Sequence, residues 1–514
     1  MSARGHVFVV RGDLRRLVAD AWLLPADKRL GVSRSWRDAA PVRHDLALPD
    51  GWGMDGVRVV QVPGTRPACW VGNVGGYGRP PAWYAEAARQ FIRHAGIALR
   101  GQSPVAGRSL PLLALPVVGT GYGGGRYISG AVAKALIDVV AEEAAANAVD
   151  VCVVCWEDAA YAALQRARAD LVRERPGSAA GWKELGADLI AQADALGGHA
   201  LDGSLVLFLG AGLSTGAGLP SWSQLLDDLA RVAGVDADQR KALTELPELD
   251  RARIVEGRLN AAGATLDAEI AVGMRSDRYP VAQGLAASLP VGEVVTMNYD
   301  ELFEMASAGA GRPVAVLPWE PARSQTRWLL KMHGCARRGD IVLTRHHYHR
   351  YEQARAALAG IVQALLITRH MLFLGFSLTD PNFHRIIDDV RQAVRRENVP
   401  AHVFGTAIVL RDEPLMNELW RGDINFVPVG AATGNPGEAS RKVELLLDRL
   451  AFVATDDTAH LMDPAYDGIL DPHERWLRDN LRDLRDRKPH GVETTKAWRI
   501  VEQLLRDFGD PAER

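Results

Sequence analysis

Polar residues that could do chemistry follow four short apolar segments of this 514-residue chain. The four motifs read G-A-G-x-S, T-x-N-Y-D, K-x-H-G and G-F-S-L-T-D-P-N, and they begin at Gly210, Thr296, Lys331 and Gly375. In an open parallel sheet, ligands bind outside the carboxyl ends of the strands. We therefore expect these groups to meet at one edge of a sheet, where a histidine and carboxylates would suit acid–base chemistry.

The first motif has the features of a nucleotide-binding turn. The apolar run Leu205–Leu209 predicts a buried strand, and the amphipathic pattern of Ser223–Val235 predicts a helix. Gly210 and Gly212 between them permit a tight turn and a close backbone approach to a ligand. Such a strand, turn and helix place backbone N–H groups around a pyrophosphate. Glycine turns also join strands to helices in proteins that bind no nucleotide.

The later motifs have structural explanations as well as chemical ones. Asn298 or Asp300 could cap a helix that begins at Glu301, since both residue types are favoured helix caps. His333 stands at the end of the apolar run Leu329–Met332, where a histidine is commonly an ordinary hydrogen-bonded residue. The identity and the order of the four motifs together are what favour a shared site.

Taken together, the motifs resemble the sirtuin-like NADase domains of bacterial antiphage defence proteins, over roughly residues 182–430. The resemblance implies a Rossmann-like, sirtuin-type parallel-sheet domain with helical insertions, and NAD as the substrate. It implies that Asn298, Asp300 and His333 are catalytic. The cofactor-binding residues that it implies are Gly210, Ala211, Gly212, Ser214, Thr215, Thr296, Gly375 and Ser377.

One departure from the family bears on the reaction. Deacetylating sirtuins carry a four-cysteine zinc module after the histidine, whereas only Cys335 follows His333 here. The triplet His346, His347 and His349 does not converge on one helix face, and we interpret it as a solvated helix start. We expect no zinc or other metal, and hydrolysis of the nicotinamide–ribose bond to nicotinamide and ADP-ribose or a cyclised form.

Two other functions stay open for the same motifs. One is a protein ADP-ribosyltransferase that uses the same NAD site, and the other is a nucleotide-binding module without catalysis. A helix expected over residues 348–369 lies between two motif strands and could cover the site. Because free NADase activity would be toxic, we expect a regulated homo-oligomer that assembles through the catalytic domain.

The N-terminal segment alternates strand and helix patterns of its own. Val7–Leu14 and Val18–Asp27, followed by the glycine-rich Leu113–Gly125, resemble a macro domain, a family that binds ADP-ribose. The resemblance implies a ligand site, and a sensor for an ADP-ribose-type nucleotide signal, formed by Asp13, Gly119, Thr120, Gly121, Tyr122 and Gly123. The family's asparagine pair is replaced by Pro25-Ala26-Asp27, so hydrolysis of the ligand is not expected. The alternative is a scaffold that only supports oligomer contacts.

These patterns predict an α/β fold in three parts: a macro-like domain at residues 1–173, a sirtuin-like domain at 182–453 and a helical C-terminal tail at 454–514. The tail offers Trp476 and Trp498 for docking. In the second part we expect seven strands, at Leu205–Leu209, Glu293–Met297, Trp328–Met332, Ile341–Leu343, Met371–Gly375, Val403–Leu410 and Ile424–Val429.

Composition excludes several classes of protein. The formal net charge of −3 gives no general attraction to nucleic acid or to an anionic membrane. Four cysteines cannot form a disulfide scaffold, and Cys152 and Cys155 fall in an apolar strand where residues three apart face opposite sides. No apolar stretch is long enough to cross a bilayer and the N-terminal residues lack the apolar region of a signal peptide, so we expect a cytoplasmic protein.

Overall fold

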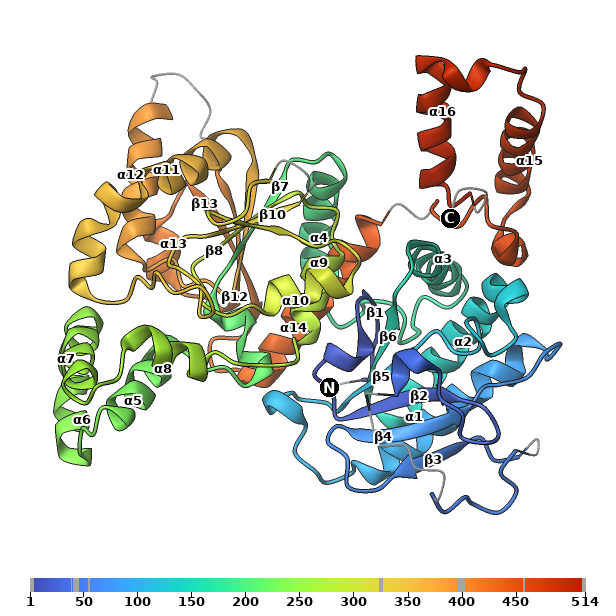
Figure 1. The fold of residues 1–514 in the computed structure, drawn as a ribbon, viewed down its shortest axis with the longest axis horizontal. Helices are drawn as coiled ribbons and strands as arrows, with labels where there is room; N and C mark the ends of the chain where they lie inside the picture. Colours follow the sequence, from blue (N-terminus) through green and yellow to red (C-terminus); the bar gives the residue numbers. More distant parts are fainter. Residues whose placement is uncertain are drawn as a thin grey trace. The chain divides into compact units, whose positions relative to one another are not determined.

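The fold is that of a computed structural model, which describes residues 4–37, 39, 46–53, 56–322, 327–394, 403–455 and 458–510. The chain divides into two compact units. The first comprises residues 1–186, 309–311 and 455–514, and the second comprises residues 187–308 and 312–454. Each unit is built around its own sheet (Figure 1).

The sheet of the second unit has seven strands in the order β13-β12-β11-β7-β8-β10-β9. Every neighbouring pair in it is parallel. The strands are β7 (Leu205–Leu209), β8 (Glu293–Thr296), β9 (Ala315–Leu317), β10 (Trp328–Lys331), β11 (His370–Leu374), β12 (Gly405–Arg411) and β13 (Ile424–Gly430). The central strands are apolar along their whole length because helices cover both faces of the sheet.

Helices of this unit lie on both sides of the sheet, and four further helices pack together next to it. The pair α11 and α12 lies on one side of the sheet, and α9 and α14 lie on the other (Figure 1). The helices α5 to α8 have a core of their own, which contains Leu229, Val255 and Ile270. The bounds are α4 (Gly186–Leu201), α5 (Trp222–Val232), α6 (Ala237–Thr244), α7 (Glu248–Ala261), α8 (Leu266–Gly273), α9 (Val281–Ser288), α10 (Leu302–Gly309), α11 (Arg345–Thr368), α12 (Pro381–Val394), α13 (Pro414–Leu419) and α14 (Pro436–Val453).

Six of the seven expected strands in this unit are present, and the seventh prediction is wrong. Ile341–Leu343 forms no strand, because its side chains are buried in two different hydrophobic clusters just before α11 begins. The short edge strand β9 was not expected from the sequence. The helix expected at Ser223–Val235 is α5, whose N-cap Ser221 and Gln224 form a reciprocal capping box. Two short 3-10 turns, Ala211–Leu213 and Thr215–Ala217, lie between β7 and this helix, and the first of them contains Gly212 of the glycine turn.

The sheet of the first unit has six strands in the order β1-β6-β5-β2-β4-β3, and β3 alone is antiparallel to its neighbour. The elements are β1 (Val7–Arg11), β2 (Ala21–Ala26), β3 (Val59–Val62), β4 (Ala68–Asn73), β5 (Leu112–Pro116), β6 (Asp150–Cys155), α1 (Pro81–Ala98), α2 (Ser129–Asn147) and α3 (Asp158–Glu174). The α/β prediction is confirmed here. Cys152 and Cys155 are both buried and neither is in a disulfide, and of the two Cys155 belongs to the main hydrophobic cluster of the unit.

The C-terminal segment belongs to the first unit. It contains a 3-10 helix at Pro464–Ile469 and the helices α15 (Pro472–Asp486) and α16 (Lys496–Asp507). Arg166 on α3 anchors it through ion pairs with Asp471 and Glu474. Of the two expected docking residues, Trp498 is buried whereas Trp476 is 67% exposed.

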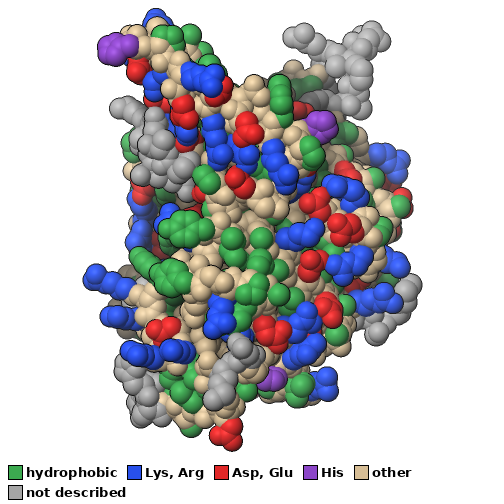
Figure 2. Space-filling model, turned by 90° about the vertical axis from the view of Figure 1, so that its right-hand side faces the viewer, with side chains coloured by type: hydrophobic (Ala, Val, Ile, Leu, Met, Phe, Trp, Pro, Cys, Tyr) green, Lys and Arg blue, Asp and Glu red, His purple; other side chains and the backbone are tan. Residues whose placement is uncertain are grey.

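Charged side chains of both signs are mixed across the face shown in Figure 2, in agreement with the small net charge. No helix in the described part of the chain has both the length and the hydropathy that a membrane span requires.

One glycine in the second unit should be irreplaceable. Gly375 has a φ of +62°, and a Cβ there would lie 2.3 Å from the backbone N of Leu213. Gly375→Ala should therefore lower the free energy of unfolding by roughly 1–3 kcal/mol, through backbone strain and a displaced glycine turn. Gly360→Ala is the matched control, since Gly360 lies inside α11 with open space around it. Urea denaturation compares the two, and equal stability of both variants would contradict the prediction.

Candidate active site

The four sequence motifs lie side by side at one edge of the seven-stranded sheet. Their strands are consecutive neighbours in the order β11-β7-β8-β10. The last residues of these strands are also paired in register: Leu374 with Leu209, Leu209 with Thr296, and Thr296 with Lys331. Every motif therefore leaves the sheet at the same level, and the expectation of a shared edge is met.

The glycines of two motifs let two loops touch backbone to backbone. The N–H of Gly210 donates to Leu374 O at 2.9 Å, and the N–H of Gly212 donates to Gly375 O at 2.9 Å. A Cβ on Gly210 would lie 2.4 Å from Gly375 O. The observed close approach is thus to the neighbouring loop.

The other residues expected to bind the cofactor on these loops are mostly at the surface. Ala211 and Thr215 are exposed, and the Thr215 hydroxyl donates to Gly212 O at 2.9 Å. Ser377 is also exposed, with its Oγ 2.7 Å from the hydroxyl of Thr379.

Ser214 connects the glycine turn to the end of β8. Its buried hydroxyl donates to Asp300 Oδ2 at 2.8 Å, and Asn298 Nδ2 donates to Ser214 Oγ at 3.3 Å. Thr296 supports this arrangement, because its hydroxyl donates to Leu209 O and accepts from the N–H of Asn298. The structure thus brings Ser214, Asn298 and Asp300 into one network.

Asp300 also caps a helix, as the simpler explanation predicted. Its Oδ1 accepts from the N–H of Leu302 at 3.0 Å, where α10 begins. The two roles use different carboxylate oxygens, so they are compatible. Asn298 makes no such cap and turns its amide toward Ser214.

His333 is buried at the end of β10, 3% exposed, between the start of α12 and the first turns of α11. Its Nε2 lies 3.8 Å from Asp380 Oδ2 and 3.4 Å from Asn382 Nδ2. Burial lowers the pKa of the imidazole below its ordinary value; the Asp380 carboxylate opposes that shift and Arg355 adds to it. A neutral imidazole is the form that accepts a proton.

Two residues around His333 were not assigned roles from the sequence. Asp380 Oδ1 caps α12 by accepting from the N–H groups of Asn382 and Phe383, while its Oδ2 accepts from the Tyr348 hydroxyl at 2.7 Å. The D-P pair at a helix start signalled the cap. Nothing in the sequence signalled Tyr348, whose ring stands edge-on to His333 with 5.6 Å between the ring centroids. The helix expected over the site is α11, and its first turn contacts His333.

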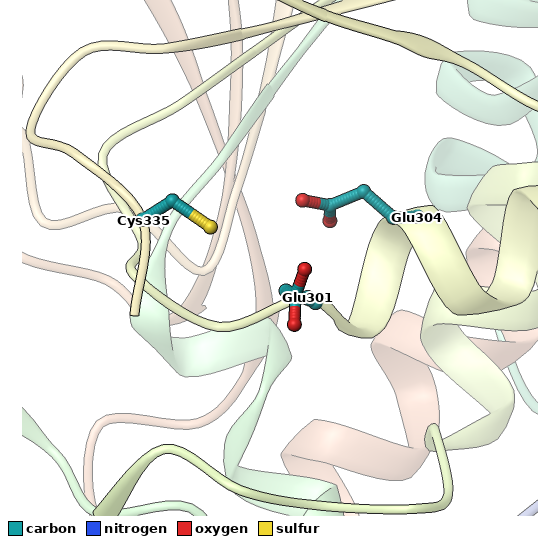
Figure 3. A group of neighbouring side chains, drawn as sticks. All are labelled: Glu301, Glu304 and Cys335. Carbon is teal, nitrogen blue, oxygen red and sulfur yellow. The ribbon is translucent and has the colours of Figure 1, made fainter. Parts of the chain in front are cut away.

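A cluster of acidic and thiol groups lies beside the site (Figure 3). Ligand atoms of Glu301, Glu304 and Cys335 lie within 4.8 Å of one another, and Glu304 and Cys335 point toward each other. The buried ammonium of Lys331 already lies among them, 2.8 Å from Glu304 and 3.7 Å from Cys335, and it also donates to Asp300 O. Burial alone would lower the pKa of Lys331, but Glu304, Cys335 and Asp300 raise it above its usual value. A fixed cation therefore supplies the charge that a metal ion would bring.

The histidine triplet forms a helix start, as interpreted from the sequence. His346 and His349 are exposed on the first turn of α11. His347 is half-buried, and its Nδ1 accepts from the N–H groups of Leu343 and Thr344, both at 3.3 Å. The three imidazoles do not form a common ligand set.

In the first unit, the expected ligand residues lie at the carboxyl end of the sheet. Asp13 follows β1, caps a 3-10 turn and pairs with Arg15 at 2.6 Å. The glycine loop 119–123 follows β5, and β6 separates these two strands in the sheet. Thr120 donates to Val117 O at 3.3 Å, and Tyr122 is 93% exposed. The tip of this loop is open, since a Cβ on Gly121 would meet nothing within 4 Å.

The geometry of the second unit agrees with a comparison of sequences. Residues 292–428 match the model of the SIR2-like domain. This part of the chain is similar to the SIR2-like domain. The matched region holds three of the four motifs, and the glycine turn at Gly210 precedes it on the neighbouring strand.

Curated relatives cover a similar part of the chain. It is 30% identical over 209 residues to the NAD(+) hydrolase ThsA of Enterococcus faecium, which covers 38% of this chain and 42% of the relative. It is also 30% identical to the ThsA of Acinetobacter baumannii, over 37% of this chain and 40% of that protein. Defense-associated sirtuin 2 of Bacillus subtilis is 27% identical over 37% of this chain and 20% of its own length. The matches thus span less than half of each of these relatives.

The contacts of His333 predict how its titration responds to one substitution. Asp380→Asn removes the carboxylate that raises the His333 pKa, so the pKa should fall further below its ordinary value and the neutral form should persist to lower pH. NMR titration of the histidine ring protons measures this shift. Asp250→Asn, an exposed carboxylate paired with Arg345, is the control and should leave His333 unchanged. A His333 pKa that rises in Asp380→Asn would contradict the assignment.

Proposed function

We propose that this protein hydrolyses NAD⁺ to nicotinamide and ADP-ribose, or a cyclised form, as a regulated effector of bacterial antiphage defence that acts by NAD depletion. The observation that carries the proposal is the joint placement of Asn298, Asp300 and His333 at aligned strand ends, next to a glycine turn. The names of the relatives, NAD(+) hydrolase and defense-associated sirtuin, support the same chemistry.

In the proposed mechanism the nicotinamide–ribose bond breaks through a state with positive charge on the ribose, as in glycoside hydrolysis. The Asn298 amide holds a water molecule or a ribose hydroxyl near the anomeric carbon, and the buried Asp300 carboxylate places negative charge below the sugar. Neutral His333 accepts a proton from that hydroxyl or water. General-base assistance of this kind contributes about 10²–10⁴ in rate.

The packing of α11 against His333 supports a resting state in which the candidate active site is closed. His333 is 3% exposed and its ring contacts Tyr348 and Tyr351, so we infer that this part of α11 moves when substrate binds. Such a movement could be coupled to the first unit, for which we propose a sensor of an ADP-ribose-type nucleotide. Self-association through the catalytic domain remains part of this proposal.

A protein ADP-ribosyltransferase is the second candidate, since transfer to a protein and hydrolysis share the same bond cleavage. Incubation with NAD labelled in the ADP-ribose part separates them. Free labelled ADP-ribose supports hydrolysis, whereas label retained on protein supports transfer.

Removal of either polar group at the strand ends should abolish turnover. His333→Ala and Asn298→Ala should each lower the kcat for nicotinamide release by at least about 100-fold, because a general base or an orienting amide is lost. His346→Ala, which removes an exposed histidine from α11, is the control and should keep wild-type activity. Release of nicotinamide by full-length protein, with and without ADP-ribose derivatives, gives the comparison. Wild-type turnover in either site variant would mean that the active site lies elsewhere.

The sensor proposal makes a separate prediction about Gly121. Gly121→Glu places a carboxylate in the open tip of the glycine loop, where it would repel the phosphates of a bound nucleotide. It should abolish stimulation of NAD cleavage by ADP-ribose derivatives, an effect of about 5–150-fold in a typical allosteric protein, and leave basal turnover unchanged. Gly177→Glu introduces the same charge at an open surface site of the same unit. Calorimetry with ADP-ribose tests binding to both full-length variants. If Gly121→Glu binds and responds like Gly177→Glu, the first unit is a scaffold.

A further inference from the structure

Helix α9 brings a buried amide to the network around Ser214. Gln283 is 1% exposed, and its Nε2 lies 3.5 Å from Ser214 Oγ. All eight residues of α9 are buried. The glycine turn rests against the start of this helix, since a Cβ on Gly216 would lie 2.8 Å from Pro280. Gln283 belongs to neither the four motifs nor the region matched to the SIR2-like model.

The hydrogen bonds at Ser214 determine the orientation of the side-chain amides of Asn298 and Gln283. The Ser214 hydroxyl has one proton, which it donates to Asp300 Oδ2 at 2.8 Å. Its oxygen can then only accept, and it accepts from Asn298 Nδ2 and Gln283 Nε2. Because the NH₂ group of Asn298 is used in this way, its Oδ1 is the end left to accept a hydrogen bond from a water molecule or a sugar hydroxyl.

The oxygen of the Gln283 side-chain amide indicates a functional role. Its Oε1 is buried and has no hydrogen-bond partner among the described residues. Buried acceptors are nearly always paired in folded proteins, so an exception beside the Ser214–Asn298–Asp300 network calls for an explanation other than stability. An apolar side chain would fill this position in α9 without leaving a polar atom unpaired.

We propose that Gln283 is a positioning residue of the active site. It donates to the Ser214 oxygen, and through Ser214 it keeps Asn298 with its amide oxygen toward the scissile bond. Its own Oε1 accepts a hydrogen bond from a hydroxyl group or water in the site. The Nε2–Oγ distance is 3.5 Å here, and catalytic hydrogen bonds are often long in the absence of substrate. This inference rests on the proposed NAD hydrolysis.

Two substitutions at Gln283 separate positioning from packing. Gln283→Leu keeps most of the volume and removes both polar ends, and it should lower kcat by about 10-fold with little change in KM for NAD. Gln283→Glu removes the donor only while the carboxyl is ionised. Next to Asp300 that carboxyl should titrate well above its ordinary pKa. The protonated acid donates to Ser214 again, so kcat in Gln283→Glu should recover as the pH falls, whereas Gln283→Leu should be low at every pH.

The control is Ser288→Ala on the same helix. The Ser288 hydroxyl donates to Gly284 O within α9, so its loss changes the polarity of the helix and not the Ser214 network. This variant should keep wild-type kcat and pH profile. Wild-type kcat in Gln283→Leu, an equal loss in Ser288→Ala, or a Gln283→Glu profile parallel to that of Gln283→Leu would each overturn the positioning role.

Crystal structures of the full-length wild type and Gln283→Leu give a readout that does not depend on turnover. Asn298 should face Ser214 through Nδ2 in the wild type and should lose this contact in Gln283→Leu. An unchanged Asn298 overturns the inference even if NAD is hydrolysed. If the wild type releases no nicotinamide with or without ADP-ribose derivatives, the proposed function fails, while a moved Asn298 still supports the positioning role.

Discussion

Parallel pairing in a single register is the constraint on which the candidate site depends. Leu374, Leu209, Thr296 and Lys331 are paired in a row, so the residues after them leave the sheet at one level. Only then can a hydroxyl from the glycine turn reach a carboxylate that follows β8, as Ser214 reaches Asp300. A shift of one strand by one residue would turn its side chains to the other face of the sheet and separate these groups.

Burial gives the groups at this edge different electrostatic roles. His333 is kept neutral because burial lowers its pKa more than Asp380 raises it, whereas Lys331 stays charged because Glu304, Cys335 and Asp300 surround it. The Lys331 ammonium holds the Asp300 carbonyl oxygen, and so it ties the end of β10 to the segment that carries the β8 carboxylate. The candidate site thus combines a buried positive charge with a buried imidazole whose pKa is lowered.

Glycines serve the same physical purpose in both units. Gly210, Gly212 and Gly375 allow two loops to pack backbone against backbone, and in the first unit Gly119 fits against the ring of Tyr84, where a Cβ would lie 2.2 Å from the ring. In both places the absence of a side chain is required by the protein's own neighbouring atoms. A glycine pattern therefore indicates a compact turn at a strand end first, and a ligand site only when polar groups converge on it.

The sequence by itself determined the α/β class, nearly all the strands of the second unit, and the set of polar residues that end four of them, because apolar runs and glycine turns are local signals. It failed at Ile341–Leu343, where a short apolar run is buried between clusters without pairing, and at β9, which has only three residues. It also did not identify Gln283 or Tyr348, since each lies on a helix outside the motif that it contacts.

The tertiary structure alone decided which strands are neighbours, that Ser214 faces Asp300, and that Asp380 lies beside His333. Ser214 and Asp300, for example, are 86 positions apart, and such contacts arise from strand order and helix packing, which no local pattern encodes.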